Sequence, residues 1–262
     1  MSEIFAGKAF LVVTGASRGI GRAIAEKFAS HLKNDSKVLL MARNLENLEK
    51  IADGMPRGLI ILCKSVDFGQ TTTKELQDAL NDALRGEKPE SFNQAIIVHC
   101  AAVVDYTRTA NDLTDFSEWQ TFFNVNMFSS AVLNGLFMKT FESSGVKKYV
   151  VNVCSYWGLT PDVYVSSYCA AKAAKDMFFK SFALENPDVS VLNYLPGLVD
   201  TEMLHDAYKK SKSEELVTRI KSALENNTVS TPEKTAECLV GVLKQQNYKS
   251  GDYVDFQKLN TV

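Results

Sequence analysis

Three side chains in the second half of the chain could together move a proton to a carbonyl oxygen. Tyr168 and Lys172 stand four residues apart in the segment YCAAK, and Ser155 lies thirteen residues before Tyr168 at the end of an apolar run. On a helix, an ammonium group at position i+4 lies on the same face as the phenol and favours the phenolate, which makes the tyrosine a usable acid at neutral pH. A serine hydroxyl can donate to the same substrate oxygen. This trio predicts carbonyl chemistry that still needs a hydride donor.

The start of the chain has the pattern of a dinucleotide site. An apolar strand predicted over residues 9–14 runs into the glycine-rich turn GASRGIG, and an amphipathic stretch follows from residue 22 to about residue 32. Gly15 permits a tight turn, Gly19 lets the backbone approach a pyrophosphate at the helix N-terminus, and Gly21 lets helix and strand pack closely. Because the glycines follow a strand and open a helix, they indicate a dinucleotide site.

The end of the second predicted strand, residues 37–41, indicates which dinucleotide binds. Sites that prefer NAD usually carry an acidic residue there to hold the ribose 2′-hydroxyl, whereas this chain has no acid and continues into Arg43. Arg43 suits a 2′-phosphate, and Arg18 in the glycine turn could add a second cation. The sequence therefore favours NADPH, although both arginines could instead be ordinary solvated surface residues.

Together with Asn126, these residues resemble the short-chain dehydrogenase/reductases over nearly the whole chain. The segments YCAAKAAKDM from Tyr168, YLPG before Met203 and SGDYVDF near the C-terminus resemble one branch, the sepiapterin reductases. The resemblance implies NADPH-dependent reduction of the side-chain carbonyls of sepiapterin and 6-pyruvoyl-tetrahydropterin, as in tetrahydrobiopterin biosynthesis. It makes Tyr168 the general acid, Ser155 a donor to the oxygen, Lys172 a ribose ligand as well, and Asn126 a residue that helps to hold a proton-relay water.

The resemblance also implies which residues hold the ligands. Asp67 would touch the adenine, and Thr201 would approach the nicotinamide amide. Asp255 would anchor a pterin, since one carboxylate can accept from its ring nitrogen and its exocyclic amino group, although the residues alone suggest an acid that ends a surface strand. The implied cofactor ligands are Gly15, Ser17, Arg18, Gly19, Ile20, Gly21, Arg43, Asp67, Phe68, Ala101, Tyr168, Lys172, Pro196, Gly197, Val199 and Thr201, and the implied substrate ligands are Ser155, Tyr168, Gly197 and Asp255.

One segment departs from the family pattern. Where most members carry Asn-Asn-Ala-Gly after the fourth strand, this chain has His99, Cys100, Ala101 and Ala102. The two alanines still let a cofactor ribose pass, but His99 and Cys100 cannot reproduce the paired donor and acceptor of an amide, so cofactor affinity or loop stability could differ. No second His/Cys cluster with ligand spacing accompanies them, and we expect a packed core pair and no metal site.

Composition narrows the class of protein. A chain of 262 residues that is 45% hydrophobic and 23% charged can bury one core, which predicts a single domain over residues 1–262. The net charge of -2 gives no basic field for nucleic acid. Five scattered cysteines suggest buried, reduced thiols and a cytoplasmic location. The N-terminus lacks the features of a signal peptide, and no apolar run is long enough for a membrane span.

The order of elements predicts the fold. Short apolar strands alternate with amphipathic helices, which is typical of an α/β, doubly wound Rossmann fold with a seven-stranded, mostly parallel sheet and helices on both faces. Right-handed crossovers would place the cofactor at the carboxyl ends of the strands. The predicted strands are residues 9–14, 37–41, 59–64, 94–100, 148–153, 190–194 and 252–256.

Two further expectations concern the surface. The polar segment 198–229 could be a lid over the substrate, and it ends where the sequence STPE from Ser230 predicts a new helix with a capping box and an early proline. The predicted helices over residues 127–141 and 167–184 carry long apolar faces, and in the resembled family such helices pair between subunits. A homodimer is therefore expected.

The leading hypothesis is an NADPH-dependent reductase of pterin side-chain carbonyls. One alternative is a broader reductase of α-diketones and other small carbonyls with the same architecture. Another is a non-catalytic protein that senses NADP(H), which is disfavoured because Asn126, Ser155, Tyr168 and Lys172 are all present. In each case the ligands are small molecules, with no nucleic acid and no membrane.

Overall fold

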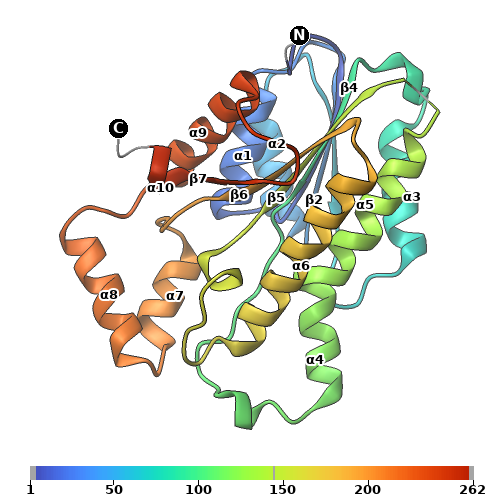
Figure 1. Cartoon of the computed structure of the whole chain (residues 1–262). Coiled ribbons are helices and arrows are strands. Elements are labelled where there is room, and N and C mark those ends of the chain that lie inside the picture. Colours follow the sequence, from blue (N-terminus) through green and yellow to red (C-terminus); the bar gives the residue numbers. More distant parts are fainter. Residues whose placement is uncertain (1–3, 144, 260–262) are drawn as a thin grey trace.

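A computed structural model describes residues 4–143 and 145–259 of the chain. It contains one seven-stranded sheet with the strand order β3-β2-β1-β4-β5-β6-β7, in which every neighbouring pair is parallel (Figure 1). The predicted doubly wound fold with a seven-stranded parallel sheet is confirmed. The strands are β1 (Ala9–Thr14), β2 (Lys37–Ala42), β3 (Ile60–Ser65), β4 (Gln94–His99), β5 (Lys147–Val153), β6 (Val189–Leu195) and β7 (Tyr253–Asp255).

Helices cover both faces of the sheet (Figure 1). Side chains of α1 (Gly19–Ala29), α2 (Leu45–Asp53) and α9 (Pro232–Gln245) pack on one face, and those of α3 (Thr73–Leu84), α5 (Ser129–Thr140) and α6 (Ser166–Glu185) pack on the other. The remaining helices are α4 (Phe116–Phe123), a π-helical turn (Asn124–Phe128), α7 (Glu202–Lys210), α8 (Glu214–Glu225), α10 (Phe256–Leu259) and three short 3₁₀ turns (Pro89–Ser91, Ala110–Asp112 and Tyr156–Gly158).

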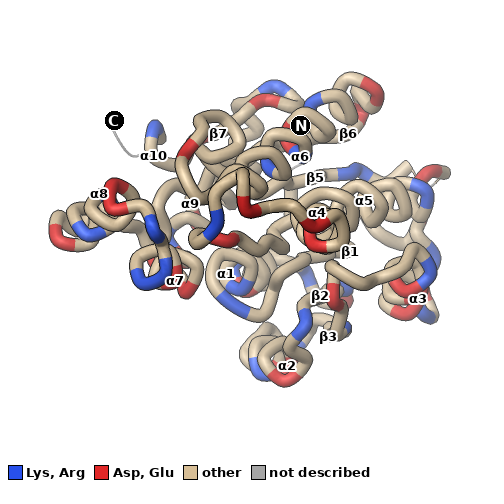
Figure 2. Tube along the Cα trace, turned by 90° about the horizontal axis from the view of Figure 1, so that it is seen from below, with Lys and Arg blue, Asp and Glu red and all other residues tan. Residues whose placement is uncertain are grey.

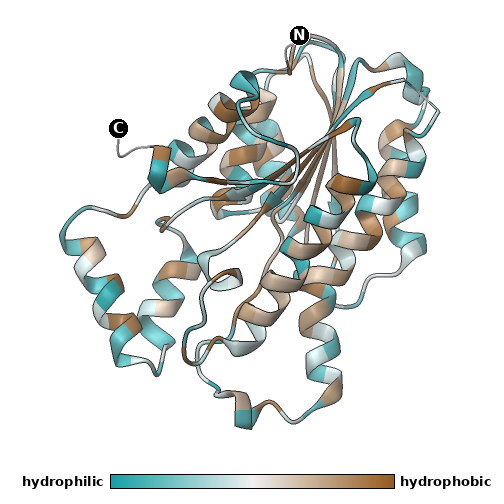
Figure 3. Cartoon of the chain, viewed as in Figure 1, coloured by the Kyte–Doolittle hydropathy of each residue, from teal (hydrophilic) through white to brown (hydrophobic). Residues whose placement is uncertain are grey.

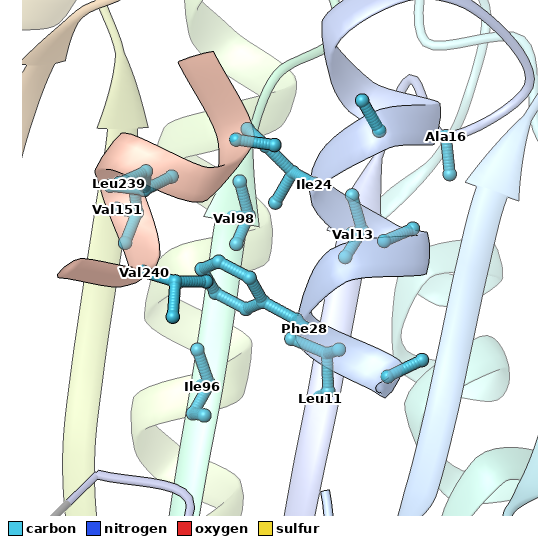
Figure 4. Close-up of a cluster of buried hydrophobic side chains, with 14 of the residues drawn as sticks. Leu11, Val13, Ala16, Ile24, Phe28, Ile96, Val98, Val151, Leu239 and Val240 are labelled. Carbon is cyan, nitrogen blue, oxygen red and sulfur yellow. The ribbon is translucent and has the colours of Figure 1, made fainter. Parts of the chain in front are cut away.

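The hydrophobic core forms because successive side chains of a strand point to opposite faces of the sheet and helices cover both faces. Strands covered on both faces are mostly apolar, as in β1, which is apolar from Ala9 to Val13 and has all six residues buried. Phe28 of α1 and Leu239 of α9 project onto β1, β4 and β5 at Leu11, Ile96 and Val151 (Figure 4). The central strands are accordingly hydrophobic, whereas α7 and α8 are mixed (Figure 3).

The order of the strands indicates at which edge of the sheet a ligand binds. Strands β1 and β4 lie side by side although β2 and β3 come between them in the sequence, so the chain reverses direction across the sheet at this point. In doubly wound sheets, ligands bind in the crevice outside the carboxyl ends of the strands at such a reversal. The helices α7 and α8 lie beyond this edge, away from the layers that cover the sheet (Figure 1).

Several local expectations need correction. The helix after residue 230 begins at Pro232, with Thr231 accepting a hydrogen bond from the Lys234 N–H, and the third helical residue is a lysine, so the reciprocal half of the predicted capping box is missing. All five cysteines are free, but only Cys154 is buried and the other four are half-buried. His99 is fully buried as expected, whereas Cys100 is only partly covered and lines the ligand cleft.

The surface carries both signs of charge. Basic and acidic residues are interspersed along α2, α3, α7 and α8 (Figure 2). None of the helices in the described residues is both long enough and apolar enough to span a membrane. Within the same described ranges, no cluster of His, Cys, Asp and Glu side chains is placed to hold a metal ion.

Candidate active site

A cleft of about 840 Å³ opens at the carboxyl ends of the strands, between the sheet edge and α7 and α8. Its wall brings together every cofactor ligand that the sequence predicted, from Gly15 to Thr201, together with Ser155. Two predicted site residues, Asn126 and Asp255, lie outside the wall. The cleft therefore joins the glycine turn and the proton-transfer trio in one site.

The glycine turn leaves room for a ligand that lies against the backbone. Gly15 has a φ of 68°, and a Cβ there would lie 2.9 Å from the backbone of Ala101. A Cβ on Gly21 would lie 2.2 Å from the Gly15 carbonyl oxygen. No side chain caps the first turn of α1, which begins at Gly19, so the N–H groups there can bind an anion. This cradle fits the pyrophosphate of a dinucleotide.

Two cations lie at the end of the cleft next to β2. Arg43 follows β2, is exposed and lines the wall. Arg18 also lines the wall, and it makes an ion pair with Glu202 at the start of α7. Neither cation is buried, so both can reach an anionic ligand, although Arg18 would have to share its charge with Glu202. Asp67, also in the wall, accepts a hydrogen bond from the Gly69 N–H at 2.9 Å.

The helix α6 positions the two central groups of the proton-transfer site. Tyr168 and Lys172 are 5% and 2% exposed, and the Lys172 Nζ lies 5.5 Å from the centre of the Tyr168 ring. The ammonium donates a hydrogen bond to the Val153 carbonyl at 2.9 Å, which fixes it below the sheet edge. Burial lowers the pKa of Lys172, but Tyr168 and Asp176 raise it, and the net pKa lies above its ordinary value. Lys172 is therefore a cation next to the phenol.

Ser155 lies at the end of β5 and begins the 3₁₀ turn Tyr156–Gly158. Its Oγ accepts a hydrogen bond from the Trp157 N–H at 3.2 Å, so its O–H remains able to donate into the cleft. The Trp157 ring meets the Tyr168 ring edge to face, with centroids 5.9 Å apart. The turn therefore holds the serine hydroxyl and the phenol in the same wall.

Asn126 is fully buried in the π-helical turn between α4 and α5. Its Oδ1 accepts from the Val103 N–H at 3.1 Å, and its Nδ2 donates to the Phe122 carbonyl at 3.0 Å. The side chain thus ties the loop after β4 to the helix, which fits the frequent use of π-helical turns at functional sites. In this structure Asn126 supports the wall, and its expected contact with a relay water stays a prediction.

A buried polar layer lies behind the trio. The Asp176 carboxylate accepts from the Asn152 Nδ2 at 2.9 Å and from the Tyr253 hydroxyl at 3.1 Å. Lys175 is fully buried and donates to the His99 carbonyl at 3.1 Å. Burial and the nearby Lys172 lower the pKa of Lys175 to about 7, and burial lowers the pKa of His99 to about 3. Positive charge in this layer is therefore concentrated on Lys172, with Asp176 as its counter-charge.

Asp255, the expected substrate anchor, does not line the cleft wall, and its contact with a substrate stays a prediction. It ends β7, is 8% exposed, and is covered by Tyr156, whose hydroxyl donates to its Oδ2. Its Oδ1 accepts from the Gln257 N–H at 2.9 Å. Tyr156 and Gln257 line the cleft in its place. No sequence pattern indicates a role for Tyr156, because its pairing with Asp255 joins residues 99 positions apart.

The outer wall is apolar and comes largely from α7 and α8, which lie within the segment 198–229 that was expected to be a lid. The Tyr106 hydroxyl donates to the Met203 carbonyl at 3.1 Å, and the Trp157 Nε1 donates to Asp162 at 3.1 Å. Arg219 of α8 makes an ion pair with the same Asp162. These contacts hold α7 and α8 against the site. The apolar side chains in this part of the wall are Tyr106, Trp157, Met203, Leu204, Leu216 and Ile220.

Comparison with known proteins agrees with the geometry. Residues 9–212 match the family model described as short chain dehydrogenase. Sepiapterin reductase of Mus musculus is 31% identical over 255 residues, which cover 95% of this chain and 97% of the mouse protein, and that of Bos taurus is 32% identical over 256 residues, 95% of each. Benzil reductase ((S)-benzoin forming) of Bacillus subtilis (strain 168) is 25% identical over 241 residues, covering 89% of this chain and 93% of that protein.

Among solved structures, the KRED1-Pglu enzyme superposes with a TM-score of 0.79 at 25% identity, covering 94% of this chain and 100% of that one. The match to the family covers well over half of the chain, and the site holds the serine, tyrosine and lysine in one wall beside the glycine turn. The chain belongs to the short-chain dehydrogenase/reductase family and is an NAD(P)-dependent carbonyl reductase of that family.

Proposed function

We propose that this reductase uses NADPH to reduce the side-chain carbonyls of pterins, with sepiapterin and 6-pyruvoyl-tetrahydropterin as its substrates. One observation carries the proposal: Ser155, Tyr168 and Lys172 share a wall with the glycine turn of α1. The sepiapterin reductases that match almost the whole chain support the pterin substrates.

In the proposed mechanism, the nicotinamide cofactor supplies a hydride to the carbonyl carbon when it is bound. Tyr168 gives its phenolic proton to the carbonyl oxygen, so that the product is an alcohol. Ser155 donates a hydrogen bond to the same oxygen and stabilises the charge that develops there. Lys172, held by the Val153 carbonyl, stabilises the phenolate that remains until a proton from solvent replaces the one transferred.

The choice of NADPH rests on the two cations at the end of β2 and in the glycine turn. Arg43 is exposed in the wall, and within the described residues it makes no ion pair that would compete with a 2′-phosphate. Arg18 would add to the positive potential, in competition with Glu202. No carboxylate follows β2 to hold a free ribose 2′-hydroxyl.

The direct test is the oxidation of NADPH followed by its absorbance with sepiapterin as the substrate. The proposal predicts that NADPH is consumed in proportion to sepiapterin, with a far lower rate for NADH. If sepiapterin causes no oxidation while NADPH still binds, the proposed substrate is wrong. If no carbonyl compound of any kind causes oxidation while NADPH still binds, the chain is a non-catalytic NADP(H)-binding protein.

A second candidate is a reductase of plain α-diketones, and one observation favours it. The Asp255 carboxylate is covered by Tyr156, and the wall around the trio is largely apolar, so a substrate without paired N–H donors meets a matching surface. The Bacillus subtilis relative is described as a benzil reductase. Parallel steady-state rates with sepiapterin and with 1-phenyl-1,2-propanedione would rank the two substrates.

We infer further that the chain is one domain that works as a homodimer in the cytoplasm, with residues 198–229 as a lid. The single sheet supports one domain, and α7 and α8 over the cleft support a lid. The apolar side chains left exposed on α5 and α6, such as Val132, Met177 and Leu184, support pairing between subunits. Sedimentation that finds only a monomer at micromolar concentration would contradict the dimer.

A further inference from the structure

Tyr156 separates the cleft from a buried carboxylate. Its side chain lines the cleft and is 42% exposed, while the Asp255 behind it is 8% exposed and does not reach the cleft wall. The Tyr156 hydroxyl donates to the Oδ2 of Asp255, and the Gln257 N–H donates to the Oδ1. Both carboxylate oxygens therefore already accept a hydrogen bond from the protein.

This arrangement matters for any substrate that presents two adjacent N–H donors. Such an edge is best bound by a carboxylate that offers both oxygens side by side. Asp255 is near the carboxyl edge of the sheet, and Tyr156 directly follows the proposed catalytic Ser155. A substrate with the two-donor edge could use this carboxylate only after the Tyr156 hydroxyl has left it.

We propose that Tyr156 is a specificity-determining residue, which holds Asp255 closed and competes with paired N–H donors of a substrate for its carboxylate. The inference rests on the proposed reduction of pterin side-chain carbonyls and refines the substrate preference of that reaction. A pterin binds by displacing the Tyr156 hydroxyl. An α-diketone without such donors binds while the pair between Tyr156 and Asp255 stays in place.

The local structure allows this exchange without disturbing the catalytic serine. The backbone beside Tyr156 is fixed, because the Trp157 N–H donates to the Ser155 Oγ at 3.2 Å and the Gly158 N–H donates to the Ser155 carbonyl at 2.9 Å. The Tyr156 side chain, in contrast, is exposed to the cleft and can rotate. The carboxylate keeps a hydrogen-bonded partner before and after the exchange, so no buried charge is left unpaired.

The variant Tyr156→Phe tests the competition, since it keeps the ring and removes only the hydroxyl. We expect the ratio of kcat/KM for sepiapterin to kcat/KM for 1-phenyl-1,2-propanedione to rise by about ten- to a hundredfold, the range for one hydrogen bond to a charged group. Tyr164→Phe, in the same loop but outside the cleft wall, is the matched control and should leave the ratio within about twofold of wild type. In the double variant Tyr156→Phe/Asp255→Asn, the gain should disappear, while the asparagine keeps an oxygen for the Gln257 N–H.

A binding measurement separates this inference from the proposed activity. Biopterin, a pterin without a side-chain ketone, is titrated into the NADP⁺-loaded protein and followed by its fluorescence. Its Kd should fall about tenfold or more in Tyr156→Phe and return to the wild-type value in the double variant. If wild type reduces neither substrate, the proposed function fails but the titration still decides the role of Tyr156. A specificity ratio and a Kd within twofold of wild type in Tyr156→Phe, or a gain that survives Asp255→Asn, would overturn the role of Tyr156.

Discussion

Lys175 is a buried charge whose removal should stabilise the protein in a pH-dependent way. It is fully buried on α6, and its ammonium donates to the His99 carbonyl at 3.1 Å. Burial and the neighbouring Lys172 lower its pKa from 10.5 to about 7. A lysine whose pKa is lower in the folded state than in the unfolded chain opposes folding at every pH at which the unfolded chain is protonated at that lysine.

The destabilisation that Lys175 causes can be calculated from its pKa values in the unfolded and folded states. The fall from 10.5 to about 7 corresponds to about 5 kcal/mol at 1.36 kcal/mol for each pH unit. In Lys175→Met this destabilisation disappears. The His99 carbonyl also loses its hydrogen-bond partner, which costs about 1–3 kcal/mol. The variant should therefore be more stable than wild type by about 2–4 kcal/mol at pH 6.5.

The sign of the pH dependence is fixed by proton binding. Below pH 7, Lys175 is protonated in both the folded and unfolded states, and the full term of about 5 kcal/mol opposes folding. Between pH 7 and 10.5 only the unfolded chain binds the proton, so the stability of wild type rises with pH. The advantage of Lys175→Met should therefore shrink as pH rises, and near pH 10 only the loss of the hydrogen bond to His99 remains.

Urea unfolding followed by tryptophan fluorescence at pH 6.5, 8.5 and 10 measures this difference. The exposed Lys234 on α9 provides the control, and Lys234→Met should change stability by less than about 0.5 kcal/mol at each pH. Titrating groups that do not interact with Lys175 contribute equally to wild type and variant, so they cancel in the difference. A Lys175→Met protein that is no more stable than wild type at pH 6.5, or whose advantage does not shrink with pH, would refute the reasoning.

Three further predictions concern the site. Tyr168→Phe should lower kcat about 10²- to 10⁴-fold while the affinity for NADPH, measured by fluorescence quenching, is retained; near-normal turnover would remove Tyr168 as the acid. Arg43→Ala should raise the KM for NADPH about tenfold or more with little change for NADH, and equal losses with both would contradict its role at a 2′-phosphate. Gly21→Ala would place a methyl group 2.2 Å from the Gly15 carbonyl oxygen, so calorimetry should show loss of dinucleotide binding; unchanged affinity would show that the turn can shift.

The cofactor half of the site could be predicted because it depends on short stretches of sequence. The strand predicted over residues 9–14 has the same bounds as β1, since an apolar run ends at a glycine with a positive φ. The helix after it begins earlier than expected, at Gly19 in place of Arg22, and Gly19 has a φ of 53°, a left-handed conformation that glycine adopts without strain. Strand order then follows from right-handed crossovers.

The substrate half could not be predicted to the same extent, because its contacts join distant segments. The burial of Lys175 follows from the packing of α6 against β4, and a sequence with lysines at positions 172, 175 and 180 gives no sign that two of them are buried. Likewise, Asp255 stands in a short polar segment that suggests an exposed strand end. Asp255 is buried because it is covered by Tyr156, which follows the end of a different strand, β5.

The two halves of the site are therefore constrained differently. The glycine turn is held by close backbone approaches, such as that of Gly15 to Ala101, which admit no side chain, so any member of this fold that binds a dinucleotide there must meet the same steric condition. The wall around Ser155 is made of side chains from the 3₁₀ turn, α7, α8 and α10, where a single hydroxyl such as that of Tyr156 can change which polar groups face the substrate. Relatives at 31–32% identity can thus share the chemistry of proton transfer and still differ in the carbonyl compound that they accept.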